Sequence, residues 1–90
     1  AAARRCRSVL ASDPEGLVPV ISHYRTVGRT FELAQTLEDQ AVLLAAQGRR
    51  RDATTVAEEA TTLYRGFGAH WDIRRAAARV ADPWGVPRSR

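Results

Sequence analysis

The sequence predicts an all-α protein built from antiparallel helix pairs, and three observations support this fold class. Gly28, Gly48 and Gly68 are evenly spaced along the chain, and glycine commonly follows the last turn of a helix. Between these glycines, apolar residues recur at the three- and four-residue spacing of one helix face. Alanine supplies 16 of the 90 residues, and its small side chain and high helix propensity favour closely packed helices over sheets.

The N-terminal part has the least regular pattern. Residues 2–11 are typical of the end of an earlier helix, and a second helical stripe runs from Leu17 to Val27. Pro19 interrupts that stripe, because proline disrupts the interior of a helix. The helix therefore either starts late, near Val18, or begins at Pro14 and kinks; we favour the kinked form.

Three further helices follow, over residues 30–47, 52–67 and 70–81. Thr30 is expected to be the N-cap of the first of them, after the glycine turn. The second has the clearest amphipathic stripe, and Pro83 ends the third, because the residue before a proline is disfavoured in helical geometry. We expect one tetratricopeptide-like helical segment over residues 1–85, ordered to about Trp84, and a flexible basic tail over residues 86–90.

The composition excludes several classes of function. All 14 basic residues are arginine, so the lysines of P-loops, Schiff bases and kinase ATP sites are absent. The single Cys6 excludes an internal disulfide and a multi-cysteine zinc site. There is no pattern of a membrane span or a signal peptide, so we expect a cytoplasmic location. A first residue other than Met suggests a piece of a longer protein.

The candidate catalytic or metal-binding residues are sparse. His23 and His70 lie far apart in the sequence, and neither has a second ligand at a metal-binding spacing. The adjacent carboxylates Glu38–Asp39 and Glu58–Glu59 point in different directions on a helix, so we expect solvent-facing surfaces and not acid/base pairs. The sequence therefore predicts a protein that is not an enzyme and has no cofactor or metal.

Arginine clusters are the features that point to a partner. Arg49, Arg50 and Arg51 fit either a phosphate contact or a charged turn beside the C-terminus of the preceding helix. Arg75 and Arg79, one turn apart, repel each other unless an anion lies between them; we expect both to point outward as a polar cap. The net charge of +4 is modest for a nucleic-acid-binding protein.

Two tryptophans flank the last predicted helix. Trp71 is expected to pack across the turn at Gly66–Gly68, and Trp84 to fold back onto the helix, because large aromatic side chains usually bury their area. An exposed Trp84 would instead mark a docking residue for another chain.

The spacing of Leu37, Ala41, Leu44, Gly48 and Ala53 resembles a helical hairpin of the tetratricopeptide type. A longer resemblance covers residues 13–80: the segments His23–Arg29, Leu37–Arg49 and Leu63–Asp72 resemble the C-terminal helical-repeat arm of large actinobacterial signalling ATPases and LuxR-type regulators. The resemblance implies an arm that senses or scaffolds partners, in a chain that also holds a nucleotide-binding domain and often a DNA-binding domain. Neither an ATPase motif nor a DNA-reading helix-turn-helix pattern occurs in this sequence.

The sequence thus favours a non-catalytic interaction or scaffold segment of a larger bacterial regulator, which binds a protein partner, the rest of its parent chain or a second copy of itself. The alternative is an Arg-rich helical domain that binds nucleic acid. The candidate contact residues for either function are Arg49, Arg50, Arg51, Trp71, Arg75, Arg79 and Trp84.

Overall fold

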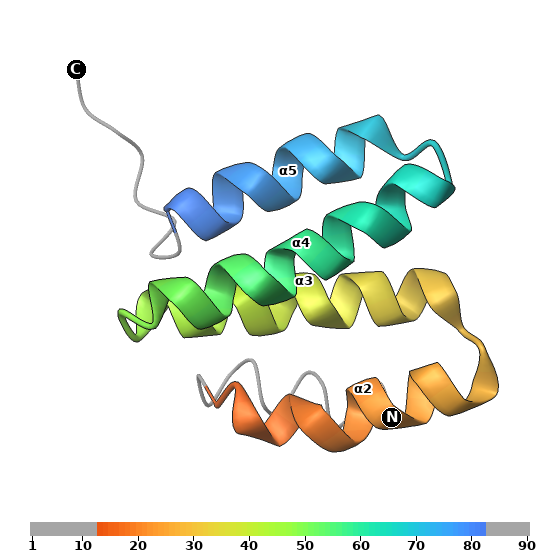
Figure 1. Ribbon diagram of the computed structural model, residues 1–90, viewed down its shortest axis with the longest axis horizontal. Helices are drawn as coiled ribbons and strands as arrows, with labels where there is room; N and C mark the ends of the chain where they lie inside the picture. Colours follow the sequence, from red (N-terminus) through yellow and green to blue (C-terminus); the bar gives the residue numbers. More distant parts are fainter. Residues whose placement is uncertain (1–12, 83–90) are drawn as a thin grey trace.

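The computed structural model describes residues 13–82, and this part of the chain is helical throughout, without a strand (Figure 1). Its elements are a short 3-10 helix η1 (Glu15–Leu17) and the helices α2 (Val18–Val27), α3 (Thr30–Ala46), α4 (Arg50–Gly66) and α5 (His70–Ala81). The predicted all-α fold class is therefore confirmed for these residues. The expectations for residues 1–12 and 83–90, which include Cys6, Trp84 and the tail, lie outside the described residues.

Successive helices run in opposite directions, and α3 is the central one. It contacts α2, α4 and α5, and its most extensive contact is with α4. In Figure 1, α4 lies in front of α3, with α2 and α5 on either side of this pair. Segments that are distant in the sequence, in α3 and α5, are thereby brought into contact.

The three glycine turns confirm the predicted helix ends and share one geometry. Gly28, Gly48 and Gly68 have φ values of 75°, 78° and 68°, the left-handed region that glycine adopts without a steric cost. In each turn the residue after the glycine donates its N–H to a carbonyl of the last helical turn: Arg29 to Tyr24, Arg49 to Leu44 and Ala69 to Tyr64, over 3.0, 2.9 and 3.0 Å. This is the Schellman pattern, and it occurs here at each of the evenly spaced glycines.

Two predicted helix starts need correction. The helix before Gly28 begins at Val18 and not at Pro14: Glu15–Leu17 form the 3-10 helix instead. Pro19 lies in the first turn of α2, where its missing N–H removes no hydrogen bond. Thr30 is the first residue of α3 and not its N-cap, which is Arg29 without a side-chain cap.

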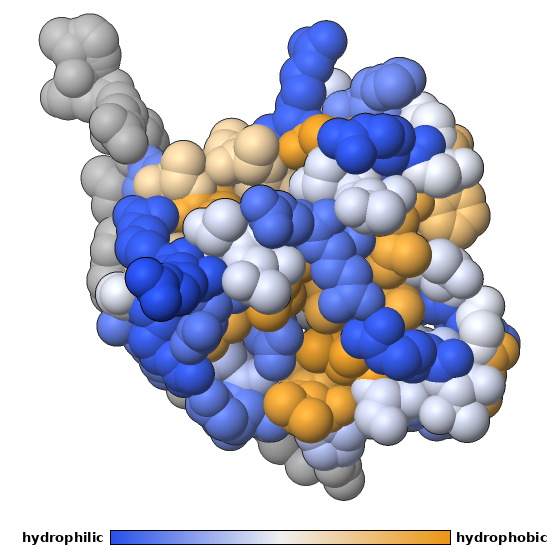
Figure 2. Space-filling model, in the orientation of Figure 1, coloured by the Kyte–Doolittle hydropathy of each residue, from blue (hydrophilic) through white to orange (hydrophobic). Residues whose placement is uncertain are grey.

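The core is built from aliphatic side chains with alanine at the closest helix contacts. Leu17, Val20, Leu37 and Tyr64 are almost completely buried, and the alanines that share this burial are Ala34, Ala41, Ala53 and Ala60. Alanine lets two helix axes approach closely, which explains how a chain with few large apolar residues forms a core. On the face shown in Figure 2, orange apolar groups lie between blue hydrophilic ones.

Candidate functional site

The arginine triplet at the start of α4 does not form a single patch. Arg49 pairs with Glu15 at 2.7 Å and with Asp52 at 3.2 Å. Arg50 donates to the backbone carbonyl of Val80, at the end of α5, over 3.1 Å. Arg51 is exposed and makes no ion pair with a described carboxylate. The triplet therefore ties α4 to η1 through Arg49 and to α5 through Arg50.

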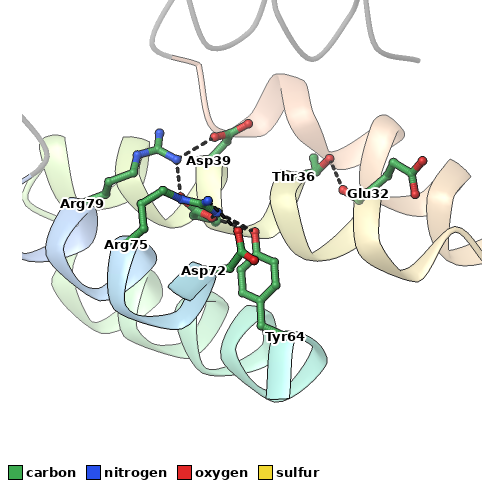
Figure 3. Close-up of polar contacts among 8 residues, drawn as sticks. Glu32, Thr36, Asp39, Tyr64, Asp72, Arg75 and Arg79 are labelled. Atoms are coloured by element: carbon green, nitrogen blue, oxygen red, sulfur yellow. Dashed lines mark hydrogen bonds and ion pairs between the residues drawn. The ribbon is translucent and has the colours of Figure 1, made fainter. Parts of the chain in front are cut away.

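The main polar cluster of the described residues surrounds Glu38, which sequence reasoning placed on a solvent-facing surface. That expectation is wrong: Glu38 is 1% exposed. The Tyr64 hydroxyl donates to Glu38 Oε1 over 2.7 Å, and Arg75 donates to both carboxylate oxygens, over 2.7 and 3.3 Å. Arg79 pairs with Glu38 Oε2 as well, and Figure 3 shows Tyr64 of α4, Arg75 and Arg79 of α5 and Asp39 of α3 gathered at this cluster.

The predicted outward orientation of Arg75 and Arg79 is therefore also wrong. Both turn toward Glu38, with side chains 36% and 39% exposed, and Asp72 and Asp39 add further ion pairs at 2.6 and 3.3 Å. The carboxylate between the two arginines is the anion that their i,i+4 repulsion requires. The like charges of Arg75 and Arg79 were the signal in the sequence that an anion lies between them. The carboxylate that does so, Glu38, lies two helices earlier in the chain, on α3.

The electrostatics of this cluster favour its charged form. Burial alone would raise the pKa of Glu38, but the hydrogen bonds from Arg75, Tyr64 and Arg79 outweigh it and hold the pKa of this carboxyl below its ordinary value. Burial and the neighbouring carboxylate raise the pKa of the Tyr64 hydroxyl. Both oxygens of Glu38 are occupied by donors, so the carboxylate acts as a tie between α3, α4 and α5 and is not available as a general base.

Trp71 does not pack across the glycine turn as predicted. It is 75% exposed, and Phe67 in that turn is 52% exposed. The aromatic contacts at this end involve Phe31 instead, whose ring centroid lies 5.7 Å from that of Tyr64 and 5.4 Å from that of Phe67, both in edge-on arrangements. Trp71 is thus a large apolar side chain left in solvent.

A groove with a volume of about 620 Å³ lies between α4 and α5. Small residues line it: Thr54, Ala57, Thr61 and Thr62 from α4, and Ala76, Ala77, Val80 and Ala81 from α5. Glu58 and Arg65 complete the lining. In Figure 2, pale-orange groups lie along the upper part of the molecule, where Figure 1 places α5, with blue groups beside them.

The candidate site is therefore the α4–α5 face, defined here as the groove together with the exposed residues Arg51 of α4 and Trp71, Arg74 and Ala78 of α5. Within residues 13–82, no three His, Cys, Asp or Glu side chains lie together as a metal ion would require.

Comparisons with known proteins do not extend this description. None of the described helices is long and apolar enough to cross a membrane. The chain matches no protein-family model, no curated protein and no solved structure.

Proposed function

We propose that this chain is a non-catalytic helical-repeat interaction module, stacked in the tetratricopeptide manner, and that it serves a larger bacterial regulator or signalling ATPase in the cytoplasm. The observation that carries the proposal is the exposed Trp71 on α5, a helix that also forms one wall of an apolar groove. Aromatic residues are enriched at protein–protein interfaces, and tryptophan is among the residues that contribute most to binding there.

The repeated turn geometry supports the repeat part of the proposal. Three evenly spaced Schellman turns place α2, α3, α4 and α5 in an alternating array, and helical repeats stack in this way, each burying its apolar face against its neighbours. The resemblance to the helical-repeat arms of LuxR-type regulators and signalling ATPases supports the same role.

The charge of residues 13–82 favours a protein partner over a nucleic acid. Residues 13–82 contain nine arginines and ten carboxylates, so this part of the chain has no cationic excess to attract phosphates. Arg49, Arg75 and Arg79, which sequence reasoning offered for such a contact, are already paired with carboxylates.

A photo-crosslinking amino acid placed at single positions of the full parent protein, in the bacterium that makes it, tests the proposal. We expect protein adducts from positions 71 and 78 on the α4–α5 face. The matched control positions are Val18 and His23 on α2, which are also exposed and lie on a helix that packs mainly against α3 and reaches α4 through the exposed Arg25–Glu59 ion pair.

Adducts of equal yield from both sets of positions, or none from positions 71 and 78, would contradict a docking role for this face. Adducts to nucleic acid at positions 71 and 78 would favour the alternative function. A duplex-binding assay between 50 and 200 mM salt provides the second arm, because phosphate contacts lose affinity steeply over that range.

A further inference from the structure

The start of α5 repeats the start of α3. Thr30-Phe31-Glu32-Leu33 and His70-Trp71-Asp72-Ile73 each follow a left-handed glycine, and each run places an aromatic, an acidic and an aliphatic residue in the same order. The backbone before the two helices is alike, as it also is before α4, with φ and ψ of −84° and 78° at Arg29, −86° and 67° at Ala69 and −89° and 65° at Arg49, so the equivalence rests on the order of the side chains. Phe31 and Trp71 therefore hold equivalent positions in consecutive helix pairs.

Only one of these two aromatic residues is covered. Phe31 lies against Tyr64, in the last turn of the antiparallel helix α4, and against Phe67, which follows that turn. Trp71 is 75% exposed, because the described residues provide no helix that lies on α5 as α4 lies on α3. The equivalence indicates that the neighbour that would cover it is a helix antiparallel to α5, with an aromatic residue in its last turn.

The register of the two helices identifies the side of α5 that such a helix would cover. With Trp71 aligned to Phe31, Ala78 of α5 stands where α3 has Glu38, the residue that Tyr64 of α4 contacts at 2.7 Å. Glu38 is buried there, whereas Ala78 is exposed. The side of α5 that carries Trp71 and Ala78 is therefore the counterpart of the α4-covered side of α3.

The outer surface of α5 fits a second helix. Its exposed residues besides Trp71 and Arg74 are His70, Ala77, Ala78 and Ala81. The alanines allow a second helix axis to approach closely. Ala77 and Ala81 also line the groove, where Ala57 and Val80 add further apolar surface.

The charges around this surface select the kind of helix. Arg51, Glu58 and Arg65 occupy successive heptad positions, which places them along one side of α4, and Glu58 and Arg65 line the groove. Arg74 lies on the outer side of α5. Within residues 13–82, Arg51, Arg65 and Arg74 make no ion pair with a carboxylate. Three such cations against one carboxylate favour acidic side chains on the partner.

We propose that the α4–α5 face binds an acidic amphipathic helix of a partner protein, antiparallel to α5, whose last turn places an aromatic ring on Trp71. This inference rests on the proposed interaction function and names the chemistry of the partner segment. Apolar contact with alanine and tryptophan is the reason that a helix, and not a nucleic-acid backbone, is the proposed occupant.

A displayed library of amphipathic helices, each about as long as α4, tests the proposal against the complete chain. The library varies the flanking positions among acidic, neutral and basic residues and the last-turn position among aromatic and aliphatic residues. We expect selection to enrich acidic helices with an aromatic residue in the last turn. The best binder is then made as a labelled peptide, and its Kd is measured by fluorescence anisotropy.

Variants of the protein locate the binding site. Trp71→Ala should weaken binding of that peptide about tenfold or more, as expected for an aromatic anchor, and Arg74→Glu about fivefold through the lost charge attraction. The matched controls Val18→Ala and Arg29→Glu change an exposed apolar residue and an exposed arginine elsewhere, and should leave the Kd unchanged.

Enrichment of basic or neutral helices, no enrichment at all, or binders insensitive to Trp71→Ala would each overturn the proposal. So would displacement of the peptide by duplex DNA at equal charge concentration in physiological salt, which would show a general polyanion site. These outcomes are separate from the crosslinking test: protein adducts at positions 71 and 78 whose crosslinked segment is not an acidic helix would leave the interaction function standing and reject this inference.

Discussion

Both sides of α5 carry arginine, but on one side the arginines are paired with a buried carboxylate and on the other the arginine is exposed to solvent. On the inner side, Arg75 and Arg79 converge on a carboxylate that is 1% exposed. On the outer side, Arg74 and Trp71 remain in solvent next to a row of alanines. The difference does not come from α5 itself; it comes from Glu38, which α3 places on one side only. An arginine in such a helix is structural or available according to whether a neighbouring helix brings an anion within reach.

The largest expected effect is the loss of both inner arginines. The double variant Arg75→Ala, Arg79→Ala leaves Glu38 buried with only the Tyr64 hydroxyl as a donor, and an unpaired buried charge costs about 3–5 kcal/mol. We expect the free energy of unfolding, measured by urea denaturation, to fall by that amount. The matched outer variant Arg74→Ala should change it by less than about 0.5 kcal/mol. Equal effects on the two sides would remove the distinction between them.

Truncation of the buried carboxylate should have the next largest effect. Glu38→Ala leaves a cavity and removes the acceptor of the buried Tyr64 hydroxyl, whereas both arginines can turn toward water, so we expect a loss of about 2–4 kcal/mol. Glu38→Gln keeps the volume and an acceptor oxygen and should lose less. If Glu38→Ala were as stable as the wild type in thermal denaturation followed by circular dichroism, the cluster would not tie the three helices together.

The pH dependence of stability provides a third, smaller effect. Because the pKa of Glu38 in the folded protein is lowered from its ordinary value of 4.5, this carboxylate stabilises the fold above that value. The contribution is lost as the pH falls through the lowered pKa. We expect the free energy of unfolding to drop between pH 5 and pH 3 by more in the wild type than in Glu38→Gln. Parallel curves for the two proteins would show that Glu38 has no special share in acid unfolding.

The smallest effect is expected on the outer side. Trp71→Ala removes an exposed side chain and should change the free energy of unfolding by less than about 0.5 kcal/mol. In a Trp84→Phe variant, where Trp71 is the remaining indole, acrylamide should quench the fluorescence nearly as well as it quenches free tryptophan. A protected indole would mean that Trp71 is covered in solution and would remove the main residue of the candidate face.

Much of the fold was predictable because its signals are local. The helix ends at Gly28, Gly48 and Gly68 follow from a backbone conformation that glycine adopts without strain, and the apolar stripes follow from helix geometry. The start at Val18 was one of two alternatives and not the favoured one, because an interior Pro19 was expected to kink the helix, whereas in the first turn a proline interrupts no hydrogen bond.

Some residues of the α4–α5 face and of the Glu38 cluster were predictable from the sequence, but their surroundings were not. Trp71, Arg75 and Arg79 were all singled out from the sequence, but Trp71 is exposed where packing was expected, and Arg75 and Arg79 pair with the buried Glu38 where an outward orientation was expected. Arg75 and Arg79, one turn apart, did indicate that an anion lies between the two charges. A single sequence does not say which of ten carboxylates is that anion.

The sequence by itself determined the helices, their ends and their alternating directions, because capping, periodicity and turn geometry act between residues a few positions apart. Only the tertiary structure decided that Glu38 is buried and Trp71 exposed. Both depend on which helix lies beside α5 and on which side, and this is set by packing between helices that are not neighbours in the sequence. The type of side chain at each position is fixed by the sequence, whereas its burial and its ion pairs depend on the helix that packs against it.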